Sequence, residues 1–340
     1  MSEYSGAVTA SSFGDPKAEF HALISGCGVY DLSWRSKIVL TGSDRVRWAN
    51  GIVTNNVRDL GEGYGNYNFL LNAQGKIQGD LYVYNFGDHL MVDTERAQTP
   101  KILEMFDKYI IMDDVEVADV SDKLTAIAVQ GPKSIDVLRK LGLTIADELE
   151  PSKVEKMVWN GIGTSVTRMA SEIALTLELW VTPENAGPLW DALLQAGAKP
   201  VGTEALESFR VAAGIPKYGQ DITDKYIPQE TEQFQALHFS KGCYLGQEIV
   251  ERVRSRGAVH RHYAGFAIAG PPPAPGTEIQ VDGKRVGEIT SARSVAVNGN
   301  EKTLALGYIR KESGEPGTAV QVNGSEALVF QPPYREVLHS

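Results

Sequence analysis

The chain has 340 residues, of which 42% are hydrophobic and 22% are charged, and its formal net charge is −10. This length exceeds one ordinary hydrophobic core, so we expect two or three packed units in a globular protein. The negative charge argues against a general affinity for nucleic-acid backbones. The sequence contains no run of about 18 apolar residues, so we expect no membrane-spanning helix.

The cysteine content and the N-terminus indicate the compartment. The two cysteines, Cys27 and Cys243, form neither a disulfide framework nor a zinc-ligand spacing. The N-terminus lacks the basic and apolar regions of a secretory signal. We therefore expect a cytoplasmic protein in a reducing environment.

Strand and helix patterns alternate through most of the chain. Small polar residues predict a flexible N-terminus over residues 1–20, and the AEFHALI pattern predicts a short helix over 17–24. Apolar runs and alternation predict strands over 29–32, 37–40, 67–71, 80–84, 124–129 and 173–181. Helical spacing and capping residues predict helices over 43–50, 99–111, 131–141, 188–195 and 205–213.

The last part of the chain has a different pattern. GPPPAPGTE (270–278) is rich in proline and glycine and predicts a boundary region. Short strand patterns follow over 278–282, 285–290, 303–310, 318–322 and 326–330. They predict a small all-β barrel or sandwich over 263–340 after an α+β body over 21–262.

Cys243 is the first candidate for chemistry. In KGCYLGQEIVERVRSR (241–256), Leu245, Ile249 and Val253 are spaced by four and predict one apolar stripe of a helix. Cys243 would lie near the first turn, where free N–H groups, the helix dipole and nearby Lys241 stabilise a thiolate. The alternative is a small buried side chain that packs a helix start.

The histidines offer two further hypotheses. His238 lies five residues before Cys243 and suits a Cys/His dyad only if the fold brings the two together; otherwise it is a loop residue. His260 and His262 would point to one face of a strand, but they lack a third ligand, so no metal site is predicted.

Arginines cluster after Cys243, in an otherwise acidic chain. This basic cluster could bind a polyanionic ligand or RNA. The alternative is that its cations are solvated and only interact favourably with the C-terminus of a helix. The members of the cluster are Arg252, Arg254, Arg256 and Arg261, together with His260 and His262.

Asp80 is the second candidate. GKIQGDLYVY (75–84) places Asp80 at the mouth of a strand, with Tyr82 and Tyr84 alternating behind it. A carboxylate beside aromatic rings can bind the ring nitrogens of a planar heterocycle or exchange a proton with them. The alternative is an ordinary turn residue. P-loop, GxGxxG, HExxH and GxSxG motifs do not occur in the contexts they require, which disfavours nucleotide-dependent and serine-hydrolase chemistry.

Several stretches together resemble the aminomethyltransferase (glycine-cleavage T-protein) superfamily. They are GVYDLS (28–33), the run from TNNVRDLGEG to GKIQGDLYVY (54–84), AVQGP (128–132), GTEALESFRVAAGIPKYGQDI (202–222) and RVGEITS (285–291). Within that superfamily, KGCYLGQE (241–248) resembles the signature of the YgfZ-type folate-binding proteins. The matching signature residues are Lys241, Gly242, Cys243, Tyr244, Gly246, Gln247 and Glu248.

The resemblance implies a fold, a cofactor and a role. It implies an α+β, three-lobed T-protein-like fold around a central folate cavity, with two lobes in the body and a C-terminal β-barrel. It implies tetrahydrofolate, or a one-carbon-loaded form, as the cofactor. YgfZ-type proteins support iron–sulfur cluster assembly or repair and affect tRNA modification, so iron–sulfur client proteins are the implied partners.

The resemblance also implies site residues. Asp80 aligns with the aspartate at the folate N5/N10 region, and Glu178 matches a glutamate that holds the pterin. The resemblance implies five further cofactor-binding residues: Tyr67, Tyr82 and Tyr84 at pocket-lining positions, and Arg210 and Tyr218 at family-like positions. Two runs depart from the T-protein pattern: DLSWRS (31–36) replaces a DVSHMG-like run, and RMASEIA (168–174) replaces an RTGYTGE-like loop.

These departures favour folate binding over the glycine-cleavage reaction. The leading hypothesis is a tetrahydrofolate-binding accessory factor for iron–sulfur proteins, with Asp80 and a reactive Cys243. The alternatives are a folate-dependent aminomethyltransferase, one-carbon transferase or demethylase, and a binding module for RNA or a partner protein. Cys27 is interpreted as structural.

Overall fold

The chain divides into two compact units. The computed structural model describes residues 1–144, 148–171, 173–257, 259–297 and 300–339. Unit one comprises Met1–Leu70, Gly79–Ala205 and Gln235–Leu245, and unit two comprises Leu71–Gln78, Leu206–Phe234 and Gly246–Ser340. The sequence predicted two continuous parts that meet at residue 262, whereas each observed unit is made of three separate segments of the chain. Within the described ranges, no helix is both long and apolar enough to cross a bilayer.

Residues 1–20, expected to be flexible, carry regular structure. β1 (Ser2–Tyr4) pairs antiparallel with β2 (Ala7–Thr9), and the turn between them contains Gly6 with a φ of +92°. α1 (Pro16–Ser25) begins after Asp15, whose carboxylate accepts hydrogen bonds from two N–H groups of the first turn. Small polar residues form a turn and a helix cap here, because glycine and aspartate satisfy the backbone geometry that these features need.

A five-stranded sheet in the order β5-β6-β7-β4-β8 forms the first layer of unit one. Its strands are β4 (Arg35–Thr41), β5 (Gly65–Leu71), β6 (Ile77–Asn85), β7 (Leu90–Glu95) and β8 (Glu116–Asp119). α2 (Arg45–Ile52) and α3 (Thr99–Tyr109) cover one face, where Trp48 meets Phe106 edge to face at 5.1 Å between ring centroids. β7 and β8 were not predicted.

A six-stranded sheet in the order β10-β11-β12-β9-β3-β13 forms the second layer. Its strands are β3 (Gly28–Asp31), β9 (Thr125–Gln130), β10 (Val154–Trp159), β11 (Ile162–Arg168), β12 (Thr176–Val181) and β13 (Lys199–Pro200). α4 (Ser134–Lys140) and α5 (Pro183–Gln195) cover one face. The predicted start of a helix at Pro188 is wrong, because Pro183 opens α5 and Pro188 lies inside it.

The β10–β11 hairpin was missed, although the sequence carries a signal for it. The turn is Asn160-Gly161, and both residues have positive φ. Asn-Gly between alternating apolar residues is a strong hairpin signal, because such turns need positive φ at both central positions.

Period-two alternation gives each sheet an apolar face and a polar or aromatic face. On β4, Ile38 and Leu40 join the core under the helices, and Lys37 lies at an alternate position. On β12, Leu177 and Leu179 do the same, while Glu178 and Trp180 alternate with them.

The two helix-free faces meet inside unit one. The Tyr84 ring of β6 packs edge to face on Trp180 of β12 at 5.1 Å. The Lys37 ammonium lies 4.6 Å from the centroid of the Trp180 ring. A polar and aromatic layer therefore separates two hydrophobic cores.

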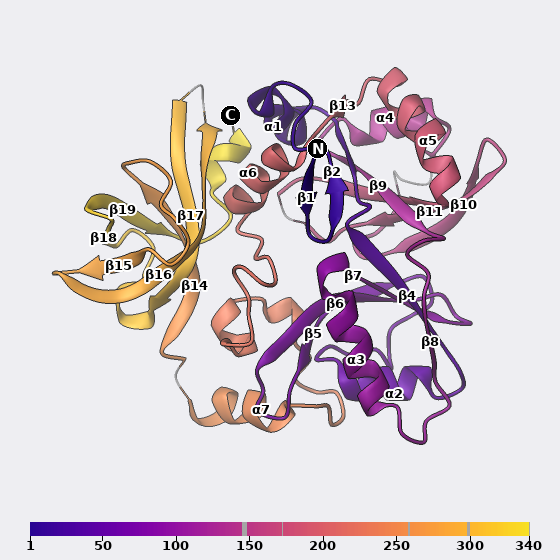
Figure 1. The fold of residues 1–340 in the computed structure, drawn as a ribbon, viewed down its shortest axis with the longest axis horizontal. Coiled ribbons are helices and arrows are strands. Elements are labelled where there is room, and N and C mark those ends of the chain that lie inside the picture. Colours follow the sequence, from indigo (N-terminus) through magenta and orange to yellow (C-terminus); the bar gives the residue numbers. More distant parts are fainter. Residues whose placement is uncertain (145–147, 172, 258, 298–299, 340) are drawn as a thin grey trace. The chain divides into compact units, whose positions relative to one another are not determined.

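Unit two contains a closed barrel of six strands in the order β14-β17-β16-β15-β18-β19 (Figure 1). The strands are β14 (Arg261–Ile268), β15 (Glu278–Val281), β16 (Lys284–Val297), β17 (Asn300–Arg310), β18 (Ala319–Val322) and β19 (Ser325–Phe330). The predicted C-terminal barrel is confirmed. The first strand of the barrel, β14, begins at Arg261. The GPPPAPGTE segment therefore forms a loop between β14 and β15, inside the barrel domain and not at its start.

Two further helices are α6 (Thr203–Ala213) and α7 (Gln247–Arg256). The segment after α6 covers the outer face of the barrel, where the Tyr226 ring stacks on Tyr308 with centroids 3.8 Å apart.

We expect Gly265 of β14 to be required for barrel stability. A Cβ at Gly265 would lie 2.3 Å from the Phe330 ring, which covers this glycine from the paired strand β19. Gly265→Val should lower the free energy of unfolding by about 1–3 kcal/mol through overpacking, as measured by denaturant titration. Ala267→Val, two residues along the same face of β14, is the control and should change it little. Equal losses in the two variants would contradict this account.

Candidate functional site

The Asp80 carboxylate is held by two side chains. Asp80 is half-buried on β6. The Tyr67 hydroxyl of β5 donates to Asp80 Oδ2 at 2.6 Å, and Gln98 Nε2 donates to Asp80 Oδ1 at 2.7 Å. The structure thus brings together the predicted residues Tyr67 and Asp80. Gln98 was not predicted, because nothing in its local pattern indicates that it reaches β6.

Aromatic rings continue from this carboxylate along the same face. Tyr67 and Tyr82 have ring centroids 5.1 Å apart, and Tyr82 and Tyr84 stack at 6.2 Å. Burial raises the pKa of all three tyrosines, so the phenols are neutral at physiological pH. Tyr82 and Tyr84 share a face because they are two residues apart on one strand, as the sequence predicted.

Glu178 lies at the far end of this aromatic row. Its side chain is 5% exposed, and Oε2 accepts a hydrogen bond from Trp180 Nε1 at 3.0 Å. Burial, and after it the negative charge of Asp93, raises the pKa of Glu178. Asp80 and Glu178 therefore belong to one layer of unit one, as neighbours of the same tyrosines.

A buried cluster of charges beside Glu178 was missed. Asp93 Oδ1 lies 2.9 Å from Arg35 Nε and 3.2 Å from Lys37 Nζ, and both Asp93 and Lys37 are 0% exposed. Within the part of the chain that the structure describes, Lys37 Nζ and Asp93 Oδ2 have no hydrogen-bond partner. A lysine inside the apolar run KIVL was an available signal, since such charges are rarely buried unless they are paired.

This layer suits a planar ring with polar edges. Neutral aromatic side chains supply flat apolar surface. Carboxylates and an ammonium group with unused hydrogen-bonding capacity supply acceptors and donors. Buried polar atoms are nearly always bonded in native proteins. Lys37 Nζ is ion-paired with Asp93 Oδ1, and its remaining N–H groups and Asp93 Oδ2 leave capacity for a polar ligand or water.

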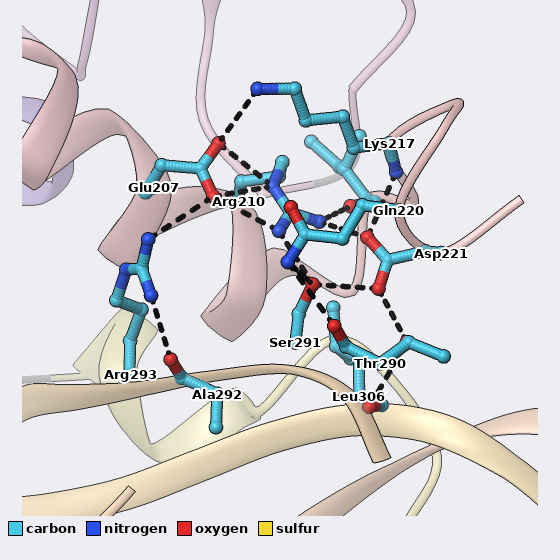
Figure 2. A network of polar contacts seen from close by, with 11 residues as sticks. Glu207, Arg210, Lys217, Gln220, Asp221, Thr290, Ser291, Ala292, Arg293 and Leu306 are labelled. Atoms are coloured by element: carbon cyan, nitrogen blue, oxygen red, sulfur yellow. Dashed lines mark hydrogen bonds and ion pairs between the residues drawn. The ribbon is translucent and has the colours of Figure 1, made fainter. Parts of the chain in front are cut away.

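Arg210 is saturated by contacts within unit two (Figure 2). Its Nε donates to Glu207, its Nη1 to the Ile215 carbonyl and to Asp221 at 2.6 Å, and its Nη2 to Glu207 and Ser291. A guanidinium has five N–H donors, and these contacts use all of them. In this structure Arg210 joins α6 to β16, and the role in cofactor binding that the resemblance implied stays a prediction.

The same network fixes the segment that follows α6. Asp221 accepts from the hydroxyls of Thr290, at 2.5 Å, and Ser291, at 2.6 Å. Tyr218 forms a backbone bridge with Ile222 in this segment. Tyr218 and Arg210 both belong to unit two, whereas Asp80 and Glu178 belong to unit one. The predicted site residues therefore fall into two groups.

Cys243 lies on an exposed loop and not in the first turn of a helix. α7 begins at Gln247, after Gly246 with a φ of +81°, so the helix predicted over 241–256 starts later. Glycine at this left-handed position breaks the pattern that Leu245 begins. The expectation that the helix terminus stabilises the thiolate is wrong, and so is the alternative of a buried, space-filling cysteine.

Lys241 anchors this loop. Its side chain is 9% exposed, and Nζ donates to the carbonyls of Val53, at 2.7 Å, and Asn55. Burial, and then the positive charge of Arg58, lowers the pKa of Lys241 to about 7. Lys241 thus pins the exposed thiol two residues away to the body of unit one.

The rest of the signature is divided between the units. Tyr244 is buried, and its ring lies 5.1 Å from the Lys241 ammonium. Gly242 is exposed beside Arg58. Gly246, Gln247 and Glu248 belong to unit two.

The other predicted motifs are engaged elsewhere. His238 Nδ1 accepts from the backbone N–H of Ser240 at 3.3 Å, which gives the dyad with Cys243 no support. Arg261 pairs with Glu230 at 2.8 Å, and Arg254 pairs with Glu251 at 3.5 Å, so the basic cluster is partly neutralised. Among the residues with described positions, no group of three or more His, Cys, Asp or Glu side chains could hold a metal ion.

Comparison with known proteins identifies the family. The model of the GCVT N-terminal domain matches residues 3–241. A chloroplastic protein of Arabidopsis thaliana, named in general terms as a transferase, is 28% identical over 95% of this chain and 74% of its own length. An aminomethyltransferase of Rippkaea orientalis is 30% identical over 98% of this chain and 93% of its own length.

A solved structure has the same fold. The glycine cleavage system aminomethyltransferase T from Bartonella henselae superposes with a TM-score of 0.88 at 21% identity, over 99% of this chain and 94% of that one. The T-protein-like α+β fold expected from the sequence is therefore confirmed. The family model and the relatives together show that this chain belongs to the GCVT-domain family, the glycine-cleavage T-protein superfamily that includes the aminomethyltransferases.

Proposed function

We propose that the protein binds a reduced folate, tetrahydrofolate or a one-carbon-loaded form, in the layer between the two sheets of unit one. The single observation that carries this proposal is the Asp80 carboxylate, held by Tyr67 and Gln98 at the end of a row of neutral aromatic rings. Membership of the aminomethyltransferase family supports the choice of ligand.

The residues of this layer fit a pterin. The rings of Tyr67, Tyr82 and Tyr84 offer flat surface for its fused rings, and Glu178 accepts from its amino edge. Lys37 Nζ and Asp93 Oδ2, both without hydrogen bonds in the described structure, offer a further donor and acceptor. Bound tetrahydrofolate supplies the N5 and N10 nitrogens that carry one-carbon groups. The role of Asp80 is to accept a hydrogen bond or a proton from that region.

We further propose that this folate-binding protein is an accessory factor for iron–sulfur cluster assembly or repair, with consequences for tRNA modification. The exposed thiol of Cys243, in a loop anchored by Lys241, supports this role. An exposed thiol is accessible to a client protein, whereas a buried one is inert. The KGCYLGQE signature connects the thiol to the YgfZ-type proteins that it resembles.

A second candidate is a folate-dependent aminomethyltransferase, one-carbon transferase or demethylase acting on a small amine. The retained Asp80 and the 30% identity to an aminomethyltransferase favour it. Formation of methylene-tetrahydrofolate from an amine, abolished by Asp80→Asn, would establish this activity. Absence of product with every amine tested would rule out this candidate function.

Asp80→Asn should weaken binding of tetrahydrofolate by about tenfold or more, because a hydrogen bond to a charged group is lost. Tyr67→Phe should have a smaller effect, since it removes one of the two donors to the carboxylate. The measurement is anaerobic isothermal titration calorimetry. Asp88→Asn is the control, because Asp88 is an exposed aspartate in the turn after β6. Absence of saturable binding by the wild type at micromolar ligand would overturn the folate proposal.

Cys243→Ala should abolish rescue of iron–sulfur enzyme activity in cells that lack the native protein, while folate affinity stays within about twofold of the wild type. The side chain is exposed, so its removal leaves the fold intact. Cys27→Ala is the matched control, because Cys27 is buried in the core of unit one. Full rescue by Cys243→Ala would show that the thiol has no role.

A further inference from the structure

On the side of β6 that faces β7, Asp80 is bonded by side chains and not by the β6–β7 ladder. The register of β6 with β7 begins at Tyr82↔Asp93, so Asp80 lies two residues beyond it. The Thr94 hydroxyl donates to the Asp80 carbonyl at 2.8 Å. Gln98 holds both the backbone N–H and the carboxylate of Asp80.

Gln98 makes two opposite bonds to the same residue. Its Nε2 donates to Asp80 Oδ1 at 2.7 Å, and its Oε1 accepts from the Asp80 backbone N–H at 3.0 Å. Only a side chain with both a donor and an acceptor can make this pair of bonds, and an ionised carboxylate cannot. Gln98 is 5% exposed, so water competes little for the contact. A Cβ on Gly79 would lie 3.2 Å from Gln98 Oε1, so glycine leaves room for the approach.

The backbone around Gln98 is fixed from two sides. The segment η1 (Arg96–Gln98) leads directly into α3. The Ala97 N–H donates to the Ser5 carbonyl at 2.9 Å, and the Arg96 N–H donates to the Trp34 carbonyl at 2.8 Å. The N-terminal hairpin therefore supports the segment that carries Gln98.

We infer that Gln98 is a positioning residue that orients the Asp80 carboxylate toward the bound folate. This inference rests on the proposed function. Gln98 acts through Asp80: its amide fixes Oδ1, and Tyr67 fixes Oδ2. A free carboxylate on a strand mouth would rotate, whereas this one presents its oxygens in one orientation.

Gln98→Glu tests the inference with almost no change in shape. At about pH 8 the new carboxylate faces Asp80 across the former hydrogen bond, and repulsion turns the Asp80 side chain away. Binding of 5-formyl-tetrahydrofolate should then be weaker than in the wild type by about tenfold or more. At about pH 5.5 the two carboxyl groups share a proton, one donates to the other, and affinity should return to within about threefold of the wild type at that pH.

Two controls separate orientation from stability and charge. Gln98→Ala removes the hydrogen-bond donor at every pH. Its affinity for 5-formyl-tetrahydrofolate should therefore be weaker than that of the wild type and should not recover at low pH. Gln74→Glu adds the same charge in the exposed turn before β6 and should bind like the wild type at both pH values. Thermal unfolding is followed in parallel, because a purely structural role would lower stability without a pH-dependent recovery of affinity.

The outcomes distinguish this inference from the proposed function. Failure of the wild type to bind 5-formyl-tetrahydrofolate overturns both. Wild-type binding together with equal binding by Gln98→Glu at both pH values overturns the role of Gln98 alone. Carbon-13 NMR titration of side-chain carboxyls in the ligand-free variant gives an independent readout: a shared-proton step absent from Gln74→Glu supports the contact, and its absence overturns it.

Discussion

The carboxylate of Asp93, shared between Arg35 and Lys37, is the interaction on which the interior of unit one depends. Burial of three charges costs desolvation free energy, which close pairing only offsets. The cluster therefore contributes little to the net stability of the fold. It makes the space between the two sheets polar, where packed apolar side chains would otherwise join the two cores into one. Removal of either cation would leave the buried carboxylate with one partner in place of two, and loss of a partner from a buried ion pair is costly.

The alternation of side chains along the strands keeps this polar layer apart from the cores. On β4, Ile38 and Leu40 pack under the helices. Lys37 precedes Ile38, so its side chain points to the opposite face of the sheet. The same period of two places Leu177 and Leu179 in the second core and Glu178 in the layer. One strand therefore contributes to both stability and the site, and a shift of register by one residue would exchange the two faces.

The residues at family-like positions differ in what surrounds them in this structure. Asp80, Tyr67, Tyr82, Tyr84 and Glu178 gather in one layer, which agrees with the ligand-binding role that the resemblance implied. Arg210 has every donor bound to partners in its own unit, so its role here is to hold the segment after α6 against the barrel (Figure 2). The difference lies in the partners: Asp80 faces aromatic side chains, whereas Arg210 is enclosed by Glu207 and Asp221.

Local patterns predicted several elements because their causes are local. Apolar spacing predicted α3, alternation predicted β6, and regular short strands predicted a barrel. The β10–β11 hairpin was equally local, and its Asn-Gly turn was overlooked. Strand β8, EVAD, lies at the edge of its sheet and is polar, so no core pattern marks it. The late start of α7 was missed because the apolar spacing of four continued backward through a glycine that the chain uses at positive φ.

The sequence by itself determined the family, the α+β body with its barrel, and the identity of Asp80 and the tyrosines as a group on one strand face. These follow from motifs and from the period of a strand, both of which are readable over a few residues. Only the tertiary structure decided that Gln98 holds Asp80, that Lys37 and Asp93 pair beside Glu178, that Arg210 is saturated and that Cys243 is exposed. Each of these depends on contacts between segments far apart in the chain, or on the burial such contacts produce, and linear spacing does not encode which distant side chains meet.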